Sequence, residues 1–173
     1  MISLQKKFSR VLGRMAAVGA LMLGSLGLHL GTATPASADE GWFILGNYRN
    51  GLCMHASSGG GPGAWVTQEN CNQNEPGQWW RWMYIGHTQV LENYSGQCLD
   101  SYNGHNPGTV IVYYCTGASS QYFAWFSESR TLEVNFAGDA VEPPGLSDRP
   151  GTQLIMWSRN GTPNQQWWVH KLA

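Results

Sequence analysis

The sequence has few charged residues and, beyond its first 14 residues, no run of basic ones. Only 12% of the residues are Asp, Glu, Lys or Arg, and the formal net charge at pH 7 is −1. Proteins bind nucleic acid and anionic membranes through clustered Lys and Arg side chains. Because the sequence has no such cluster in its main part, we expect neither nucleic acid nor a membrane among its partners.

A long apolar run is also missing after residue 38. Before it, four basic residues precede an apolar stretch from Met15 to Leu30, which glycines interrupt, and Ala36-Ser37-Ala38 then forms an A-x-A cleavage site. This pattern predicts a secretory signal peptide over residues 1–38 and not a membrane-spanning helix. We therefore expect a secreted, extracellular product of residues 39–173, whose net charge falls from −1 to −5 when the four basic residues are removed.

Motifs for metal binding and catalysis are scarce. The sequence has no CxxC and no histidines at ligand spacing, so we expect no metal and no cofactor. No nucleophile motif such as GxSxG accompanies the histidines. Glu133, Asp139 and Glu142 are close in sequence and two of them could flank a glycosidic bond, but we expect solvated strand and turn residues. The chain is therefore expected not to be an enzyme.

What the sequence does contain is a threefold internal repeat. The middle copy, residues 93–123, reads NYSGQCLDSYNGHNPGTVIVYYCTGASSQYF, with a Gly-turn, a Cys-Leu-Asp, a loop and a terminal Gln-x-aromatic. Weaker copies lie on both sides at a spacing of roughly 45 residues, which indicates a repeated fold in one domain. The repeats span about 43–87, 88–130 and 131–173.

The secondary structure is predicted to be all β. Each repeat has about four short alternating or β-branched runs between turn signals, and no helical period persists. One such unit cannot bury its own apolar face, so three should close around a pseudo-threefold axis. The expected strands are 43–46, 52–56, 64–69, 79–85, 90–94, 97–102, 110–114, 122–128, 131–136, 139–142, 152–157 and 167–172.

The four cysteines all lie in the part expected to be exported, where the environment is oxidising. Four cysteines allow three pairings. The repeat symmetry selects one pair in each of the first two repeats, Cys53 with Cys71 and Cys98 with Cys115. Each bridge would close a loop of about 18 residues and contribute about 3 kcal/mol.

Together these features resemble the ricin B-type lectins, a β-trefoil family marked by Gln-x-Trp repeats. The resemblance covers roughly Gly41 to Ala173, with a Phe in place of the second Trp. It implies a β-trefoil of three four-strand repeats that binds glycans, galactose-type or related ones. It also implies a mainly structural role for the Gln-x-aromatic residues, which are Gln78, Trp80, Gln121, Phe123, Gln165 and Trp167.

The family carries at most one shallow sugar site per lobe, built from an acid after the first cysteine, a ring two residues before the second, and polar residues at the Gln-x-aromatic. A carboxylate can accept hydrogen bonds from adjacent sugar hydroxyls, and a flat ring can stack on the C–H face of a pyranose. The first lobe has His55, Glu69 and Gly77 instead and is expected not to bind. The resemblance implies two sites, Asp100, Tyr113, Ser120 and Gln121 in the second lobe, and Glu142, Trp157, Asn164 and Gln165 in the third.

Two alternatives remain open at this level. Tyr113 and Trp157 could be half-buried strand aromatics, and Asp100 a turn residue that accepts hydrogen bonds from backbone N–H groups. The domain could also be a non-catalytic protein-interaction or toxin-type cell-binding subunit. It would then use an aromatic patch of the first lobe made of Trp65, Trp79 and Trp82.

Overall fold

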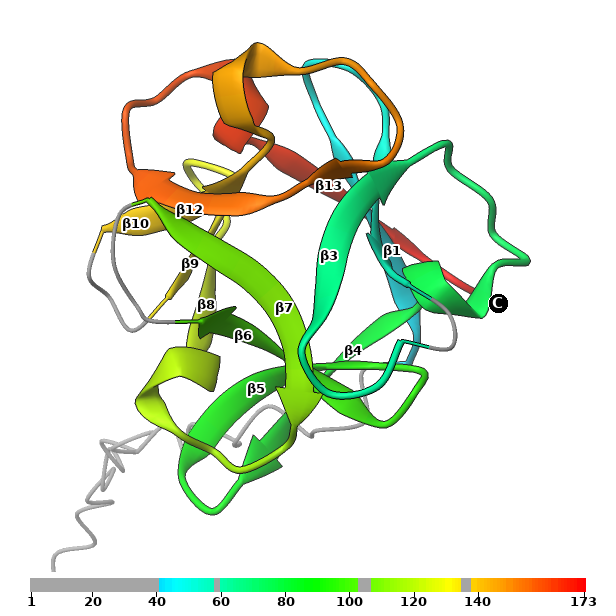
Figure 1. Ribbon diagram of the computed structural model, residues 1–173, viewed down its shortest axis with the longest axis vertical. Coiled ribbons are helices and arrows are strands. Elements are labelled where there is room, and N and C mark those ends of the chain that lie inside the picture. Colours follow the sequence, from blue (N-terminus) through cyan, green and yellow to red (C-terminus); the bar gives the residue numbers. More distant parts are fainter. Residues whose placement is uncertain (1–40, 58–59, 103–106, 135–137) are drawn as a thin grey trace, which may run out of the picture. The chain divides into compact units, whose positions relative to one another are not determined.

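The computed structural model describes residues 41–57, 60–102, 107–134 and 138–173 (Figure 1). The predicted signal peptide and the end of the predicted strand 131–136 lie outside these residues. Within the described ranges, no helix is long and apolar enough to cross a membrane.

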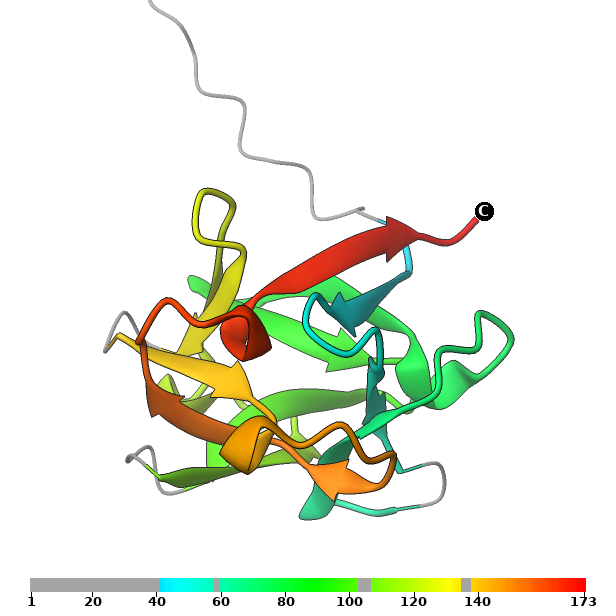
Figure 2. The same ribbon diagram turned by 90° about the horizontal axis from the view of Figure 1, so that it is seen from above.

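The described chain consists of short antiparallel strands and single 3-10 turns, seen from two sides in Figures 1 and 2. The 3-10 turns are η1 (Pro76–Gln78), η2 (Ser119–Gln121), η3 (Pro144–Leu146) and η4 (Pro163–Gln165). The strands are β1 (Phe43–Asn47), β2 (Cys53–Ala56), β3 (Ala64–Glu69), β4 (Trp80–Ile85), β5 (Thr88–Asn93), β6 (Gln97–Tyr102), β7 (Gly108–Tyr114), β8 (Phe123–Phe126), β9 (Thr131–Val134), β10 (Asp139–Glu142), β11 (Thr152–Gln153), β12 (Ile155–Ser158) and β13 (Trp167–Lys171).

Three strands, one from each repeat, surround the centre of the molecule as seen in Figure 1: β3, β7 and β12. Strand β7 pairs with both β3 and β12, and the short β11 pairs with β3. Each of these strands also forms a hairpin within its own repeat, β2–β3, β6–β7 or β10–β12. The arrangement is the predicted all-β trefoil with pseudo-threefold symmetry.

The predicted strand 152–157 is divided in two at Leu154. This residue is fully buried, its N–H donates to Val66 O at 2.8 Å, and its carbonyl accepts from Val110 N at 3.2 Å. Leu154 therefore lies where the chain stops pairing with β3, through β11, and begins to pair with β7, through β12. A local strand pattern does not show this change of partner.

The three Gln-x-aromatic rings Trp80, Phe123 and Trp167 are fully buried in the core. Each tryptophan also satisfies its indole N–H, which donates to the carbonyl of Met54 at 3.1 Å or of Val141 at 3.0 Å. A buried indole needs such a partner. This burial agrees with a structural role for the rings.

The Gln residues of the motif also have one role in common. Each lies at the end of a 3-10 turn, fully or almost fully buried, and its side-chain amide closes the loop that precedes the turn. The amide nitrogens donate to the carbonyls of Asn70, Tyr114 and Ser158, and the amide oxygens accept from the N–H groups of Asn72, Thr116 and Asn160.

Both predicted disulfides are present, Cys53–Cys71 and Cys98–Cys115, with sequence separations of 18 and 17. The third lobe has Ala140 at the position of the first cysteine, since Ala140 pairs with β12 as Cys98 pairs with β7. The first two lobes are thus closed covalently and the third is not.

In the third lobe, an ion pair between Arg159 and Glu133 lies near the place where the other lobes have a disulfide. Arg159 Nη1 lies 3.4 Å from Glu133 Oε1, and the Glu133 side chain is only 3% exposed. Thr131 Oγ1 donates to the same oxygen at 2.6 Å.

The prediction of solvated carboxylates is therefore wrong for Glu133, and also for Glu142, which is 5% exposed. Asp139 is half-buried, and its Oδ1 accepts from Ser158 Oγ at 3.1 Å.

Candidate functional site

In the second lobe, Asp100 and Tyr113 lie on the same face of the hairpin β6–β7. Asp100 pairs with Ile111, and Tyr113, two residues further along β7, pairs with Cys98. Paired residues in antiparallel strands share a face, and so do residues two apart. The carboxylate and the ring therefore belong to one surface. Tyr113 is 42% exposed there, which leaves its ring accessible as a platform.

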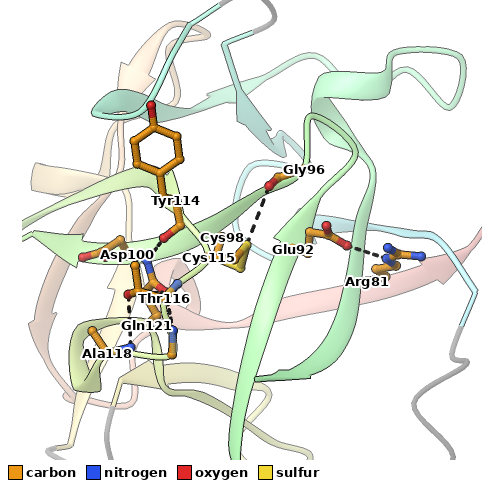
Figure 3. Close-up of a disulfide and its surroundings, with 11 residues drawn as sticks. Arg81, Glu92, Gly96, Cys98, Asp100, Tyr114, Cys115, Thr116, Ala118 and Gln121 are labelled. Carbon is orange, nitrogen blue, oxygen red and sulfur yellow. Dashed lines mark hydrogen bonds and ion pairs between the residues drawn. A yellow bond between two sulfur atoms is a disulfide. The ribbon is translucent and has the colours of Figure 1, made fainter. Parts of the chain in front are cut away.

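Asp100 is held by the side chains that follow β7. Its Oδ2 accepts from Ser120 Oγ at 3.2 Å and from Gln121 Nε2 at 3.0 Å. Figure 3 shows Asp100 and Gln121 beside the Cys98–Cys115 disulfide. Asp100 lies inside β6 and not in a turn, so the interpretation of this acid as a turn residue is wrong. Two charge-assisted donors instead fix its position.

The third lobe repeats this geometry on β10–β12. Glu142 pairs with Ile155, and Trp157, two residues along β12, pairs with Ala140. Trp157 is 40% exposed. The acid and the ring therefore stand in the same diagonal relation as in the second lobe.

Glu142 differs from Asp100 in its surroundings. It is 5% exposed, and its buried Oε2 has no hydrogen-bond partner among the described residues. Burial raises the pKa of Glu142 above the usual range, although hydrogen bonds from Gln165 and Asn164 lower it in part. An unsatisfied buried acceptor costs free energy.

In the first lobe the same two positions hold His55 and Glu69, which pair with Thr67 and Cys53. A Cβ added at Gly77 would lie 2.5 Å from His55 Nε2, so the imidazole occupies the space of the polar side chain that Ser120 or Asn164 supplies in the other lobes. A hollow remains at this place. Its lining is polar and includes no ring that could serve as a platform: His55, Glu69, Asn70, Asn72, Glu75 and Gln78. That the first lobe does not bind sugar stays a prediction.

The three tryptophans predicted as one interaction patch lie in three different environments. Trp82 is half-buried and packs against the core. Trp79 contacts Tyr94 edge to face, with ring centroids 5.0 Å apart, and lines a hollow of about 450 Å³ together with Trp42. Trp65 is 59% exposed on β3, the strand that pairs with β7.

Sequence reasoning missed one residue that positions the second site. The fully buried Ser101 donates through Oγ to the carbonyl of Ser120 at 3.1 Å. It thereby holds η2, whose Ser120 hydroxyl and Gln121 amide donate to Asp100. Its place directly after Asp100 in the Cys-Leu-Asp-Ser sequence is a signal that could have indicated it.

Known proteins are similar to this chain in sequence and in fold. The profile of the ricin-type beta-trefoil lectin domain matches residues 86–172, and that of the ricin-type beta-trefoil lectin domain-like group matches residues 32–114. Nigrin b from Sambucus nigra is 28% identical over 141 residues, which cover 76% of this chain and 24% of nigrin b. The chain thus spans about a quarter of the length of that relative.

Solved structures agree. The designed threefold-symmetric protein ThreeFoil matches with a TM-score of 0.68 and 25% identity over 77% of this chain and 100% of its own. The agglutinin from Abrus precatorius matches with a TM-score of 0.67 and 20% identity over 80% of this chain and 51% of its own. With one family profile spanning half of the sequence, the chain belongs to the ricin-type beta-trefoil lectin domain family.

Proposed function

We propose that this chain is a secreted, non-catalytic lectin module that recognises glycans through shallow sites in its second and third lobes. The observation that carries the proposal is the repeated geometry of acid and ring. Asp100 with Tyr113, and Glu142 with Trp157, occupy equivalent positions in two hairpins, each acid buried and each ring exposed. Two separate hairpins with this combination favour ligand binding over mere strand packing.

The chemistry of each site follows from its parts. Asp100 can accept hydrogen bonds from two adjacent sugar hydroxyls while Ser120 and Gln121 hold it in place. The exposed ring of Tyr113 offers a flat apolar face at little cost in side-chain entropy. Such sites are shallow and individually weak. Two of them on one domain favour branched or clustered glycans through avidity.

The two rings provide the test. Tyr113→Ala and Trp157→Ala are each expected to weaken binding at their own lobe by about tenfold, because the stacking surface is lost while the core is untouched. Calorimetric titration with a glycan selected on an array measures the loss. Tyr84→Ala is the matched control, since Tyr84 is 47% exposed on β4, outside both sites. Absence of any glycan binding by the wild-type domain at millimolar concentration would contradict the proposal.

Binding in the third lobe is expected to depend on pH. The sugar hydroxyls need the ionised Glu142 as acceptor, and burial raises its pKa. As pH falls, Glu142 therefore becomes protonated earlier than an ordinary glutamate, and affinity at this lobe declines. The same shift acts on stability in the opposite direction, because the folded state favours the neutral acid and its contribution improves as pH falls. Titrations between neutral and mildly acidic pH, with Glu142→Gln as the pH-independent reference, measure this. A flat pH profile at the third lobe would contradict it.

A protein-interaction subunit is the alternative function. The hollow beside Trp42 and Trp79 is the feature that favours it, since two indole rings and the exposed Tyr94 lie together there. A domain that binds no glycan but loses a protein partner on Trp79→Ala would support this function.

A further inference from the structure

We propose that Trp65 is a second sugar-stacking ring of the second lobe, so that this lobe binds two linked sugar residues. The proposal rests on the glycan-binding function above. It adds to the site a residue that belongs to the first lobe and that the sequence assigned to a different surface.

Strand pairing places Trp65 in the same row as Asp100. Ile111 on β7 pairs with Asp100 of β6 on one side and with Trp65 of β3 on the other. Residues paired across neighbouring antiparallel strands share a face. The row from Asp100 through Ile111 to Trp65 therefore crosses three strands on one surface, and β3 and β7 lie side by side in Figure 1.

Burial shows that this surface is the outer one. The residues before and after Trp65 on β3 point inward: Val66 is fully buried and Ala64 packs against the core. On β7, Val112 is 1% exposed and also belongs to the core. Trp65, at 59% exposed, thus presents its indole to solvent on the face that carries Asp100 and Tyr113.

The spacing fits more than one sugar. Asp100 and Trp65 are separated by two interstrand distances, about 10 Å, whereas Trp65 and Tyr113 are diagonal neighbours about 7–8 Å apart. A pyranose held by Asp100 and stacked on Tyr113 leaves Trp65 facing the next residue of the glycan. Among the described residues the ring contact of Tyr113 goes to Tyr114, with centroids 5.4 Å apart, and none of the ring contacts involves Trp65.

The other lobes lack this second ring. The position of Trp65 is taken by Thr109 in the third lobe, where Thr109 pairs with Ile155, the partner of Glu142. In the first lobe it is taken by Gln153, which pairs with Thr67. The second lobe should therefore prefer a disaccharide over a monosaccharide, and the third lobe should not. The molecule thus contains its own control.

The experiment compares matched sugars by NMR and calorimetry. The probes are methyl β-galactoside with lactose, methyl β-glucoside with cellobiose, and N-acetylglucosamine with diacetylchitobiose. The indole N–H signal of Trp65, assigned with Trp65→Phe, is expected to shift with a disaccharide and not with its monosaccharide. In a Glu142→Gln/Trp157→Ala background, where the third lobe has lost both its acid and its ring, Trp65→Ala should weaken disaccharide binding about tenfold and leave monosaccharide binding unchanged. Trp65→Phe, which keeps a ring, should retain most of the affinity.

The control is Thr109→Ala in an Asp100→Asn background, which should leave the disaccharide-to-monosaccharide ratio of the third lobe unaltered. Equal losses for both sugars on Trp65→Ala would indicate a merely structural role and overturn the inference. Unchanged disaccharide affinity on Trp65→Ala, with binding still lost on Asp100→Asn, would overturn it while the lectin function stands. Failure of the wild-type domain to bind any probe would overturn both.

Discussion

Removal of the Cys98–Cys115 disulfide is expected to lower the free energy of unfolding by about 3 kcal/mol and to weaken glycan binding in the second lobe. The stability loss follows from the loop of 17 residues that the bridge closes, which the unfolded chain would otherwise leave open. The binding loss follows from position, since Cys98 lies two residues before Asp100 and pairs with Tyr113. Chemical denaturation and calorimetry of Cys98→Ala/Cys115→Ala measure the two effects.

The matched control is Cys53→Ala/Cys71→Ala. Its loop has a sequence separation of 18, so its cost in stability should be nearly the same. It lies in the first lobe, whose site positions hold His55 and Glu69, so glycan binding should persist. Alanine is a reasonable substitute because Ala140 occupies the equivalent buried position in the third lobe. Equal effects of the two double variants on glycan binding would contradict the assignment of a site to the second lobe.

Asp100→Asn is expected to reduce glycan affinity about 10- to 100-fold, and Glu142→Gln less, about 3- to 10-fold. Asp100 is fixed by two side-chain donors and lies beside a disulfide, so its oxygens are in place before the sugar arrives. Glu142 has one more rotatable bond and lies in the lobe without a disulfide. Ordering such a side chain costs about 0.5–1.5 kcal/mol.

The two substitutions also differ in their effect on the fold. Glu142→Gln removes a buried carboxylate whose Oε2 has no partner in the described structure, so the free energy of unfolding should stay level or rise by up to about 1 kcal/mol. Asp100→Asn replaces an acceptor with an amide that faces two donors, and it should not stabilise the fold. Calorimetric titration of both variants with one glycan ranks the sites. An equal or larger loss of affinity at Glu142 would make the third lobe the principal site.

Several features of this protein could be predicted from local sequence. The strands 64–69, 97–102 and 139–142 were predicted with the bounds that the structure has for β3, β6 and β10. Strand alternation and turn residues act within a few positions, so short windows contain them. The disulfide pairing was predicted from the repeat symmetry, and the relation of Asp100 to Tyr113 from the resemblance to the ricin B-type lectins. Both lie within one hairpin, whose two strands meet in a register that is set locally.

The sequence alone determined the three repeats, the main hairpin strands and the cysteine pairs, since each depends on contacts within a repeat, and the family resemblance added the trefoil fold. Only the tertiary structure decided the features that depend on contacts between repeats or on depth below the surface. Trp65 joins the second lobe because β3 pairs with β7, and no local pattern specifies that register. Glu133 and Glu142 are buried in the folded chain. Glu133 there forms an ion pair with Arg159, and burial raises the pKa of Glu142.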